Sequence, residues 1–467
     1  MDVAIVVLGV AHALGILSSF NALMSVRTSQ GAIAWIVSLN TFPILTVPLY
    51  WVFGRTHFQG YVKLRQGADA KLTSERQRIK AALEPYFVEM SGPIAALQRL
   101  AQLPTLRGNK VQLLVDGEDT FASILDGIEQ AKEYVLVQFY IIHDDELGRK
   151  LKDCLLRAKR RGVRVWLLYD ELGSSGLGHY VRELVAEGVD VRAFNSRRGR
   201  GNFFQLNFRN HRKIVVVDGM SAWVGGHNVG DEYLGKSRKF PVWRDTHMQI
   251  VGPAALSLQI SFLEDWNWSA QEVLQLEWKP SHTAQDAQVM IVPSGPVDKV
   301  ETCSLMFQLA INSSQSRCWI ATPYFIPDEA VVGALILAKM RGVDVKVLIP
   351  DRPDNWLIYF SEYDFVGKLL RQGIEIYRYL PGFNHQKVFI IDDRVASVGT
   401  ANLDNRSLRL NFEVTALVSN TEFVQQVDRM LKHDIAHAKL MTEDEIENKH
   451  LWFRVCARAS YLLAPIQ

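Results

Sequence analysis

Two stretches of this sequence, FRNHRKIVVVD (208–218) and GFNHQKVFIID (382–392), repeat one pattern of chemically active residues. Each reads Asn-His-x-Lys, then four apolar residues, then Asp. On an extended strand, residues two apart point to the same side, so each histidine lies beside a lysine. A histidine next to a lysine is electrostatically unfavourable unless an anion lies between them. The pattern therefore predicts a site for a phosphate group.

Each copy also has an asparagine 17 residues after its histidine, in GGHN and in GTAN. The intervening residues, IVVVDGMSAWVGG and VFIIDDRVASVGT, read as two strands around a turn, which would return each asparagine to the neighbourhood of its own histidine. A lysine supplies charge and an amide supplies a hydrogen bond to a phosphoryl oxygen. The residues expected to bind and attack the phosphate are His211, Lys213, Asn228, His385, Lys387 and Asn402.

The duplication itself has a chemical use. One histidine can attack phosphorus as a nucleophile. The other can protonate the leaving alkoxide and then deprotonate the incoming alcohol or water. Two copies that meet face to face would supply one of each, and the residues alone leave open which histidine takes which role.

Four carboxylates accompany the motifs. A nucleophilic imidazole needs an acceptor for its other ring nitrogen, and we assign this role to Asp245, in WRDTHMQIVG, and to Glu413, in LNFEVTALV. The alternative is that these two residues form ordinary surface ion pairs. Asp218 and Asp392 complete the two motifs, but their odd offset from the histidines predicts that they point away from the phosphate. We expect them to support the hairpin more than the chemistry.

The repeat extends well beyond the motifs. AKRRGVRVWLLYD (158–170) matches AKMRGVDVKVLIPD (338–351), and each reads as the end of a helix, a glycine cap and an apolar strand. Strands that alternate with helices indicate a mixed or mostly parallel sheet with helices on its faces. The sequence therefore predicts two similar α/β lobes, lobe 1 over residues 110–285 and lobe 2 over residues 286–467.

The first 54 residues differ from the rest. Two charge-free runs, Val3 to Val26 and Thr28 to Gly54, flank Arg27, and each exceeds the ~20 residues that a membrane-crossing helix needs. A cleaved signal peptide is the alternative for the first run, but the run lacks a basic segment before it. Residues 1–54 are thus predicted to form a transmembrane hairpin. Residues 55–109 are basic, and the positive-inside rule places them and the lobes in the cytoplasm.

Composition excludes some classes of protein. The net charge of +2 gives no support for a nucleic-acid binder. The four cysteines have no framework spacing and are expected to be reduced. No cluster has metal-ligand spacing, so we expect a reaction without metal or cofactor. Two segments stay open: RRGRG (197–201) as a solvated loop or a lipid contact, and the aromatic and basic tail (449–467) as core packing or a membrane surface.

The motifs NHRKIVVVD…GGHN and NHQKVFIID…GTAN resemble those of the phospholipase D superfamily. Together with TPYFIP and GTANLDNRSLRLNFEV, they are most similar to the bacterial cardiolipin synthases. The resemblance implies two duplicated phospholipase D-like lobes in a protein that is anchored in the bacterial inner membrane. It also implies phosphatidylglycerol as donor and acceptor, cardiolipin and glycerol as products, and a phosphohistidine intermediate on His211 with His385 as the acid and base. The resemblance extends over nearly the whole chain, but GGHN and GTAN replace the Gly-Ser-x-Asn common in the superfamily.

Other functions use the same residues. Water in place of the lipid alcohol would make the protein a hydrolytic phospholipase D, and another alcohol would make a different phosphatidyltransferase. A nuclease disagrees with the membrane hairpin and the low net charge. An inactive membrane scaffold disagrees with the intact His, Lys and Asn in both copies. Neither the oligomeric state nor the choice of acyl chain follows from the sequence.

Overall fold

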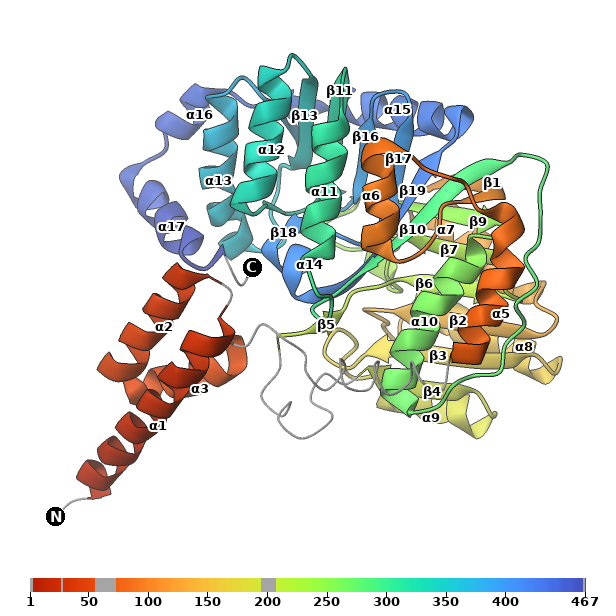
Figure 1. The fold of residues 1–467 in the computed structure, drawn as a ribbon, viewed down its shortest axis with the longest axis horizontal. Coiled ribbons are helices and arrows are strands. Elements are labelled where there is room, and N and C mark those ends of the chain that lie inside the picture. Colours follow the sequence, from red (N-terminus) through yellow and green to blue (C-terminus); the bar gives the residue numbers. More distant parts are fainter. Residues whose placement is uncertain (1–2, 27, 55–72, 195–206, 465–466) are drawn as a thin grey trace. The chain divides into compact units, whose positions relative to one another are not determined.

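The N-terminal helices belong to one compact unit of this computed structural model, and both histidine motifs belong to a second (Figure 1). The second unit runs from Lys71 to Phe194 and from Asn210 to Gln467, so it contains both lobes. The predicted basic residues of 55–72 and the RRGRG segment lie outside the described residues. The structure describes residues 3–26, 28–54, 73–194, 207–464 and 467.

The N-terminal unit contains three apolar helices where two were expected. Helix α1 (Val3–Ser25) has 23 residues and, among the described residues, is the one helix long and apolar enough to cross a membrane. The second run is divided into α2 (Ser29–Thr41) and α3 (Pro43–Phe53), so the second arm of the expected hairpin is broken at one of its two prolines, Pro43. The break is at Phe42, with φ −130° and ψ 57°, because the residue before a proline avoids the helical conformation and Pro43 has no N–H to donate.

Helices α2 and α3 nevertheless pack against α1. Ala22, Leu39 and Tyr50, one from each helix, form a small buried cluster. The Tyr50 hydroxyl donates a hydrogen bond of 2.7 Å to Asn21 Oδ1 on α1. Polar contacts of this kind hold helices together where the surrounding solvent is apolar. Most of the large apolar side chains on the outer faces of these helices are exposed, as expected of surfaces that face lipid.

Both lobes contribute to one continuous sheet. Lobe 1 has the strand order β1-β9-β7-β6-β2-β3-β4, and lobe 2 has the matching order β10-β19-β17-β16-β11-β13-β14-β20, in which β20 is an extra strand at the edge. Antiparallel pairing of β1 with β10, with Leu106 opposite Val289, joins the halves. The strands are β1 (Leu106–Val115), β2 (Tyr134–Phe139), β3 (Arg164–Asp170), β4 (Asp190–Phe194), β6 (Ile214–Val217), β7 (Ser221–Gly225), β9 (Thr246–Val251), β10 (Ala287–Ser294), β11 (Arg317–Ala321), β13 (Asp344–Pro350), β14 (Glu375–Tyr379), β16 (Val388–Ile391), β17 (Val395–Gly399), β19 (Asn411–Ser419) and β20 (Ala438–Leu440).

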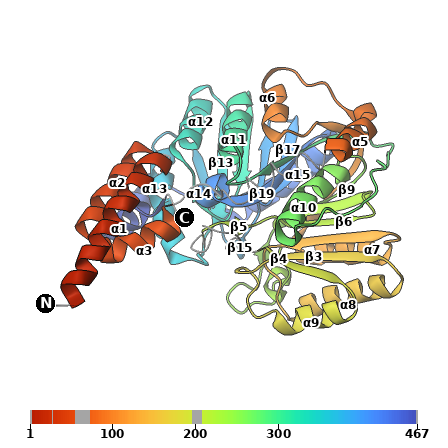
Figure 2. The same ribbon diagram turned by 60° about the horizontal axis from the view of Figure 1, so that its bottom comes forward.

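The sheet is mixed, as predicted. Strands β2, β3 and β4 are parallel, whereas β6, β7 and β9 pair antiparallel, and lobe 2 repeats this arrangement. Helices cover both faces of the sheet (Figure 2). The helices of the two lobes are α7 (Asp116–Glu129), α8 (Glu146–Arg160), α9 (Gly178–Ala186) and α10 (Ala255–Ala270) in lobe 1, and α11 (Thr302–Ser313), α12 (Glu329–Met340), α13 (Trp356–Leu370), α14 (Asn405–Arg409), α15 (Thr421–Ala436), α16 (Glu443–Glu447) and α17 (Leu451–Tyr461) in lobe 2. Helices α16 and α17 pack against α13.

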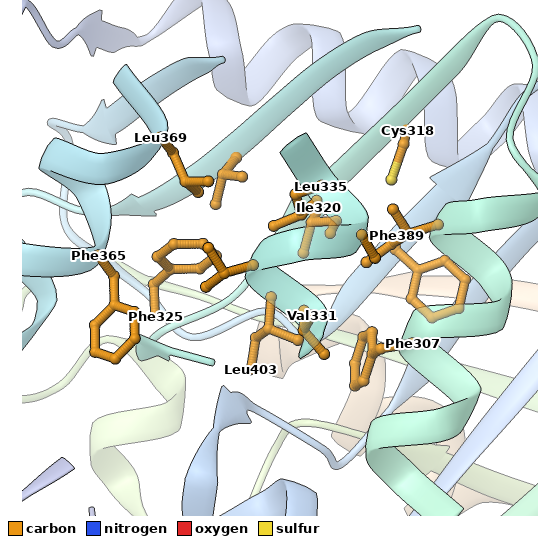
Figure 3. Close-up of a cluster of buried hydrophobic side chains, with 14 of the residues drawn as sticks. Phe307, Cys318, Ile320, Phe325, Val331, Leu335, Phe365, Leu369, Phe389 and Leu403 are labelled. Carbon is orange, nitrogen blue, oxygen red and sulfur yellow. The ribbon is translucent and has the colours of Figure 1, made fainter. Parts of the chain in front are cut away.

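Each lobe has its own hydrophobic cluster. In lobe 2, Phe307 of α11, Ile320 of β11, Leu335 of α12 and Phe389 of β16 pack together between the sheet and its helices (Figure 3). Strands β6 (IVVV) and β16 (VFII) are apolar and buried along their whole length, as expected where helices cover both faces of a sheet. The segment before lobe 1 forms α5 (Thr73–Leu83), a 3-10 turn (Glu84–Tyr86) and α6 (Gly92–Ala101). Helix α6 joins the lobe 2 cluster through Leu97, so this part of the predicted juxtamembrane connector belongs to the globular core.

A buried ion-pair network connects the lobes. Arg244, at the end of the short strand β8 (Trp243–Arg244), donates from Nε to both carboxylate oxygens of Asp434 on α15, at 2.9 and 3.0 Å. Its NH1 group donates to Asp116 at 3.0 Å. Asp434 also accepts a hydrogen bond of 2.8 Å from Gln386, the residue between the motif's histidine and lysine. The network therefore ties α15 to the loop that carries His385.

Replacing Arg244 with methionine should lower the melting temperature strongly. The change leaves Asp434 buried without its cation, and removing one partner of a buried pair costs about 3–5 kcal/mol. Thermal unfolding of the purified protein in detergent would measure this. Arg160→Met is the matched control because its pair with Glu187, at 3.3 Å, is exposed and should contribute little. Equal melting temperatures for the two variants would contradict the network's role.

Candidate active site

The two histidines lie just before strands and not on them. His211 and Lys213 occupy the irregular residues between β5 (Arg209–Asn210) and β6, so the expected strand position is wrong. His385 and Lys387 occupy the same place before β16. The reason is that the backbone N–H of each histidine donates to a backbone carbonyl of the other lobe. His211 N donates to Phe412 O at 2.9 Å, and His385 N donates to Arg244 O at 2.7 Å.

Each histidine is hydrogen-bonded to the carboxylate of the other lobe. His211 Nδ1 lies 3.0 and 2.9 Å from the two oxygens of Glu413 on β19. His385 Nδ1 lies 2.6 Å from Asp245, which immediately precedes β9. Both carboxylates are fully buried. The sequence assigned Asp245 and Glu413 to the histidines but could not show that the pairs are crossed, and this crossing means that neither lobe holds a complete site.

Glu413 is held as an anion by several donors. Thr400 Oγ1 donates to it at 2.6 Å, Ser407 Oγ at 2.8 Å and Asn411 Nδ2 at 3.2 Å. Burial raises the pKa of the Glu413 carboxyl, but the interaction with His211, the charge of Lys213 and the hydrogen bond from Thr400 outweigh burial, so the pKa lies below its usual value. Glu413 therefore stays ionised and fixes the His211 ring.

Both histidines are neutral in the free protein at neutral pH. Burial lowers the pKa of His211 to about 4, with Lys213 also lowering it and Glu413 opposing the shift. Burial, and then Lys387 and Lys213, hold the pKa of His385 well below its ordinary value. With Nδ1–H donated to a carboxylate, the lone pair of each ring is on Nε2. This is the form in which an imidazole attacks an electrophile or accepts a proton.

The two motif lysines are buried, and neither has a carboxylate partner among the described residues. Lys213 Nζ donates to the carbonyl of His211 at 2.7 Å, and Lys387 Nζ donates to the carbonyl of His385 at 2.5 Å. Burial lowers the pKa of Lys387 to about 8, and it lowers the pKa of Lys213 well below the ordinary value. Neither ammonium forms an ion pair with a carboxylate in the described part of the chain. A phosphate anion beside them would raise both pKa values and restore the charged forms.

The two asparagines are already hydrogen-bonded within the protein. Asn228 Nδ2 donates to the Tyr233 hydroxyl at 2.9 Å, and its Oδ1 accepts from Ile141 N at 3.1 Å. Asn402 Nδ2 donates to Asp404 at 3.2 Å, while its buried Oδ1 has no partner among the described residues. A direct contact from either amide to a phosphate stays a prediction.

The aspartates that end the motifs hold the hairpin turns in place. Asp218 accepts hydrogen bonds of 2.8 to 2.9 Å from the N–H groups of residues 132–134, at the start of β2. Asp392 does the same for residues 315–317 before and at the start of β11. Both have positive φ, 52° and 53°, in the turn. Each lies at the opposite end of its strand from the histidine.

Aromatic residues that sequence reasoning missed surround the histidines. The Tyr140 ring centre lies 5.0 Å from that of His211. Trp243 lies 5.1 Å and Tyr233 6.2 Å from His385. The repeat gave no signal for Tyr140, because the strand register places Pro323 at the equivalent position of lobe 2. Nothing marked Trp243 or Tyr233, which come from connections without a repeat.

The difference between GGHN and GTAN follows from the two carboxylates. A Cβ at Gly226 would lie 2.1 Å from Asp245 Oδ1, so no side chain fits there. At the equivalent place in lobe 2, the Thr400 hydroxyl donates to Glu413. The second residue of GGHN and of GTAN therefore contacts the orienting carboxylate. In lobe 2 the Thr400 hydroxyl donates to Glu413 and not to a phosphate.

A second pair of histidines lies buried behind the site. His227 and His247 are fully buried with ring centres 5.6 Å apart. In the part of the chain that the structure describes, none of their four ring nitrogens has a hydrogen-bond partner. Burial lowers the pKa of each to about 3.

This pair should make the protein less stable in acid. Unfolded imidazoles titrate near ~6.5, so between that pH and about 3 the unfolded chain binds more protons than the folded one. The free energy of unfolding then falls as the pH falls below ~6.5, by up to about 1.4 kcal/mol per histidine and pH unit. Melting temperatures measured between pH 7.5 and pH 5 should fall less in His247→Leu than in the unaltered protein. A curve for His247→Leu parallel to that of the control, His433→Leu at an exposed histidine, would contradict this.

One group of described residues has donor atoms close enough together for a metal ion. It comprises His143, Asp145 and Glu232, whose ligand atoms lie within 4.8 Å of one another. Both oxygens of Asp145 already accept backbone hydrogen bonds, from Gly148 at 2.9 Å and from Asp231 at 2.7 Å. Asp145 is thus explained as the N-cap of α8, and His143 lies 3.3 Å from Glu232 as an ion pair. The metal-independent reaction stays a prediction.

Comparison with known proteins agrees with this geometry. A family model described as cardiolipin synthase, PLD-like domain, matches residues 124–241 and 308–435. The chain belongs to this family. The family match falls once in each lobe and includes His211 in the first segment and His385 in the second. The resemblance inferred from the motifs is confirmed.

Relatives of the family resemble the chain over nearly its full length. Cardiolipin synthase A of Pseudomonas putida strain F1 is 46% identical over 466 residues, which cover 98% of this chain and 97% of that protein. The same enzyme of Pseudomonas syringae is 44% identical and covers 98% of each chain. The solved structure of phosphatidylserine synthase from Haemophilus influenzae has a TM-score of 0.61 at 15% identity, over 80% of this chain and 100% of that one. This last similarity concerns the fold alone, and it agrees with the predicted fold class.

Proposed function

We propose that this chain is a cardiolipin synthase that transfers the phosphatidyl group of one phosphatidylglycerol to the head-group hydroxyl of another. The products are cardiolipin and glycerol. Relatives of that name are 44 to 46% identical to it over nearly the whole length. The observation that carries the proposal is the crossed arrangement, in which two neutral histidines, each fixed by the other lobe's carboxylate, accompany two buried lysines.

In the first step, His211 Nε2 attacks the phosphorus of the donor lipid. The P–N bond forms, the bond from phosphorus to the glycerol head group breaks, and protonated His385 gives its proton to the leaving oxygen. The negative charge of the bound phosphodiester raises the pKa of His385 from its lowered value and so supplies this protonated form. Lys213 and Lys387 neutralise the charge on the non-bridging oxygens.

In the second step, His385 is neutral and accepts the proton of a hydroxyl on the second phosphatidylglycerol. That oxygen attacks phosphorus, the P–N bond breaks, and His211 regains its lone pair. The reaction consumes no water. Its free-energy change is small and the transfer is reversible, because one phosphodiester bond is broken and another is formed. Water in the place of the second lipid would give phosphatidic acid instead.

The chain meets its substrate at the bacterial cytoplasmic membrane. Helix α1 has the length and composition to span the bilayer. We propose that α2 and α3, which pack against α1, return the chain across it as one broken segment, with the lobes on the cytoplasmic side. The support for this orientation is the excess of Lys and Arg after residue 54 over the single Arg27 in the connection.

The test uses the purified protein in detergent with labelled phosphatidylglycerol, with and without EDTA. Cardiolipin and glycerol in equal amounts, unaffected by EDTA, are expected. Phosphatidic acid with glycerol and no cardiolipin would make the protein a hydrolytic phospholipase D. Loss of activity in EDTA with recovery on one metal would contradict the metal-free mechanism.

A further inference from the structure

The end of lobe 2 formed by α13 and α17 exposes an apolar surface. Trp452, Val455 and Leu462 are 61%, 58% and 78% exposed, although they lie on or directly after a well-packed helix. At the start of α13, Trp356 is 62% exposed. The two helices are labelled in Figure 1. We call this surface the α13–α17 surface, and it consists of Trp356, Leu357, Leu451, Trp452, Val455 and Leu462.

Packing of the inner face of α17 against α13 holds the whole helix, and therefore its exposed outer face, in place. Phe453 is buried, and its ring centre lies 4.7 Å from that of Tyr363 and 5.1 Å from that of Phe360, both on α13. Ala457 is buried on the same face. The helix is thus anchored in the lobe 2 core, and the exposed residues opposite are not the frayed end of a mobile tail. Of the two readings that the sequence left open for this tail, core packing therefore holds for one face only.

The exposed indoles border one continuous patch. Phe360 lies between them, with its ring centre 6.1 Å from that of Trp356 and 6.4 Å from that of Trp452. The apolar area therefore extends from the start of α13 to α17. Single exposed apolar residues are common on soluble proteins, but a contiguous patch with two tryptophans marks an interaction site.

Cations flank this patch. A groove of about 1140 Å³ between α13, α16 and α17 is lined by four of them, against the carboxylates of Asp364 and Glu447. Asp364 is already paired with a cation, at 2.8 Å from Arg458 NH1. The remaining charge of the groove is positive, and it suits an anionic surface. The four cations are Arg371, Lys449, Arg454 and Arg458.

The patch begins at the rim of the active site. Tyr324, which follows β11, donates its hydroxyl hydrogen to Asp354, a carboxylate close enough to the site for its charge to act on Lys387. Asp354 lies two residues before Trp356, and its carbonyl accepts a hydrogen bond of 3.0 Å from Lys239. A surface that contacted the patch would therefore also approach the entrance to the histidines.

We propose that the α13–α17 surface docks on an anionic phospholipid bilayer. The indoles lie at the level of the head groups, the aliphatic residues reach the acyl boundary, and the arginines contact lipid phosphates. Tryptophan and basic residues on the same face are typical of the membrane interface. Docking orients the rim of the site toward the lipid head groups, so a helix near the C-terminus adds to the anchoring by α1. The proposal requires only that the protein binds lipid, and its binding test is independent of turnover.

The binding test places a fluorophore on the surface of the full-length protein in nanodiscs. Trp452→Cys is labelled in a Cys456→Ser background, because Cys456 is the one cysteine of the chain that is not buried. Met340→Cys, at a 69% exposed site at the far end of α12, is the matched control. With phosphatidylglycerol and doxyl-labelled lipid, we expect strong quenching at position 452 and none at 340. A probe at 452 that is shielded from water but not quenched by lipid would mean that protein covers the patch, from this chain or a second copy, and would overturn the proposal. Equal behaviour of the two probes would overturn it as well.

Turnover gives a second, independent reading. Trp452→Ser combined with Leu462→Ser should lower activity on phosphatidylglycerol in vesicles about tenfold, since two apolar anchors are lost. Activity on dispersed short-chain phosphatidylglycerol should not change. The control pair, Leu337→Ser and Met340→Ser, removes exposed apolar residues from α12 and should leave both activities intact. Equal losses on both substrates, or none on either, would refute docking, and an absence of cardiolipin in the unaltered protein would refute the proposed function instead.

Discussion

Replacing His211 with alanine will abolish phosphatidyl transfer, with a loss of at least about 10⁴-fold in kcat, because the variant has no nucleophile to form the P–N bond. The fold should survive the change. Glu413 keeps three hydrogen-bond donors, Thr400, Ser407 and Asn411, so its charge is not left without partners. Cardiolipin formation from labelled phosphatidylglycerol measures the loss, and thermal unfolding shows that the protein is intact.

His179→Ala is the matched control for this experiment. His179 lies on α9, with a side chain that is 69% exposed, and it belongs to neither motif. Its removal should leave activity and melting temperature unchanged. A folded His211→Ala protein that still made cardiolipin at the original rate would exclude this histidine as the nucleophile.

The sequence predicted the participants of the site better than their connections. His211, His385, the lysines and the two carboxylates could be named because the duplication marks them twice. The crossing of Glu413 to His211, and of Asp245 to His385, could not be read. A repeat shows which residues correspond, but the crossing depends on how the two copies pair in space, through β1 and β10.

The same holds for the fold: features set by neighbouring residues could be predicted, and features set by contacts between distant residues could not. The mixed sheet followed from strand and helix patterns, and the break at Phe42 followed from a local rule that the hydropathy of the run concealed. By contrast, the place of α6 in the lobe 2 core depends on contacts far apart in the sequence. The aromatic residues around His385 depend on such contacts too, since Trp243 and Tyr233 come from lobe 1.

The second large effect should separate the roles of the two histidines. In Asp245→Asn, the amide can no longer accept the Nδ1–H of His385 as a carboxylate does, and transfer from phosphatidylglycerol should fall about 10³- to 10⁴-fold. The Thr246 N–H, which bonds Asp245 Oδ1 at 2.8 Å, can still bond the asparagine oxygen, so the local backbone is kept. Glu413→Gln should cause a similar loss through His211.

A substrate with a better leaving group tells these two losses apart. In phosphatidyl-p-nitrophenol, the leaving oxygen is far less basic than a glycerol alkoxide, so its departure needs no acid. Asp245→Asn should therefore release a burst of nitrophenolate equal to the enzyme present and then stall, because the weakened His385 cannot deprotonate the acceptor. Glu413→Gln should give no burst, since the nucleophile itself is impaired. If each carboxylate served the histidine of its own lobe, Asp245→Asn would behave like His211→Ala, and Glu413→Gln would behave like His385→Ala. With His211 as the nucleophile, the crossed geometry requires the opposite matching, and the burst measures it.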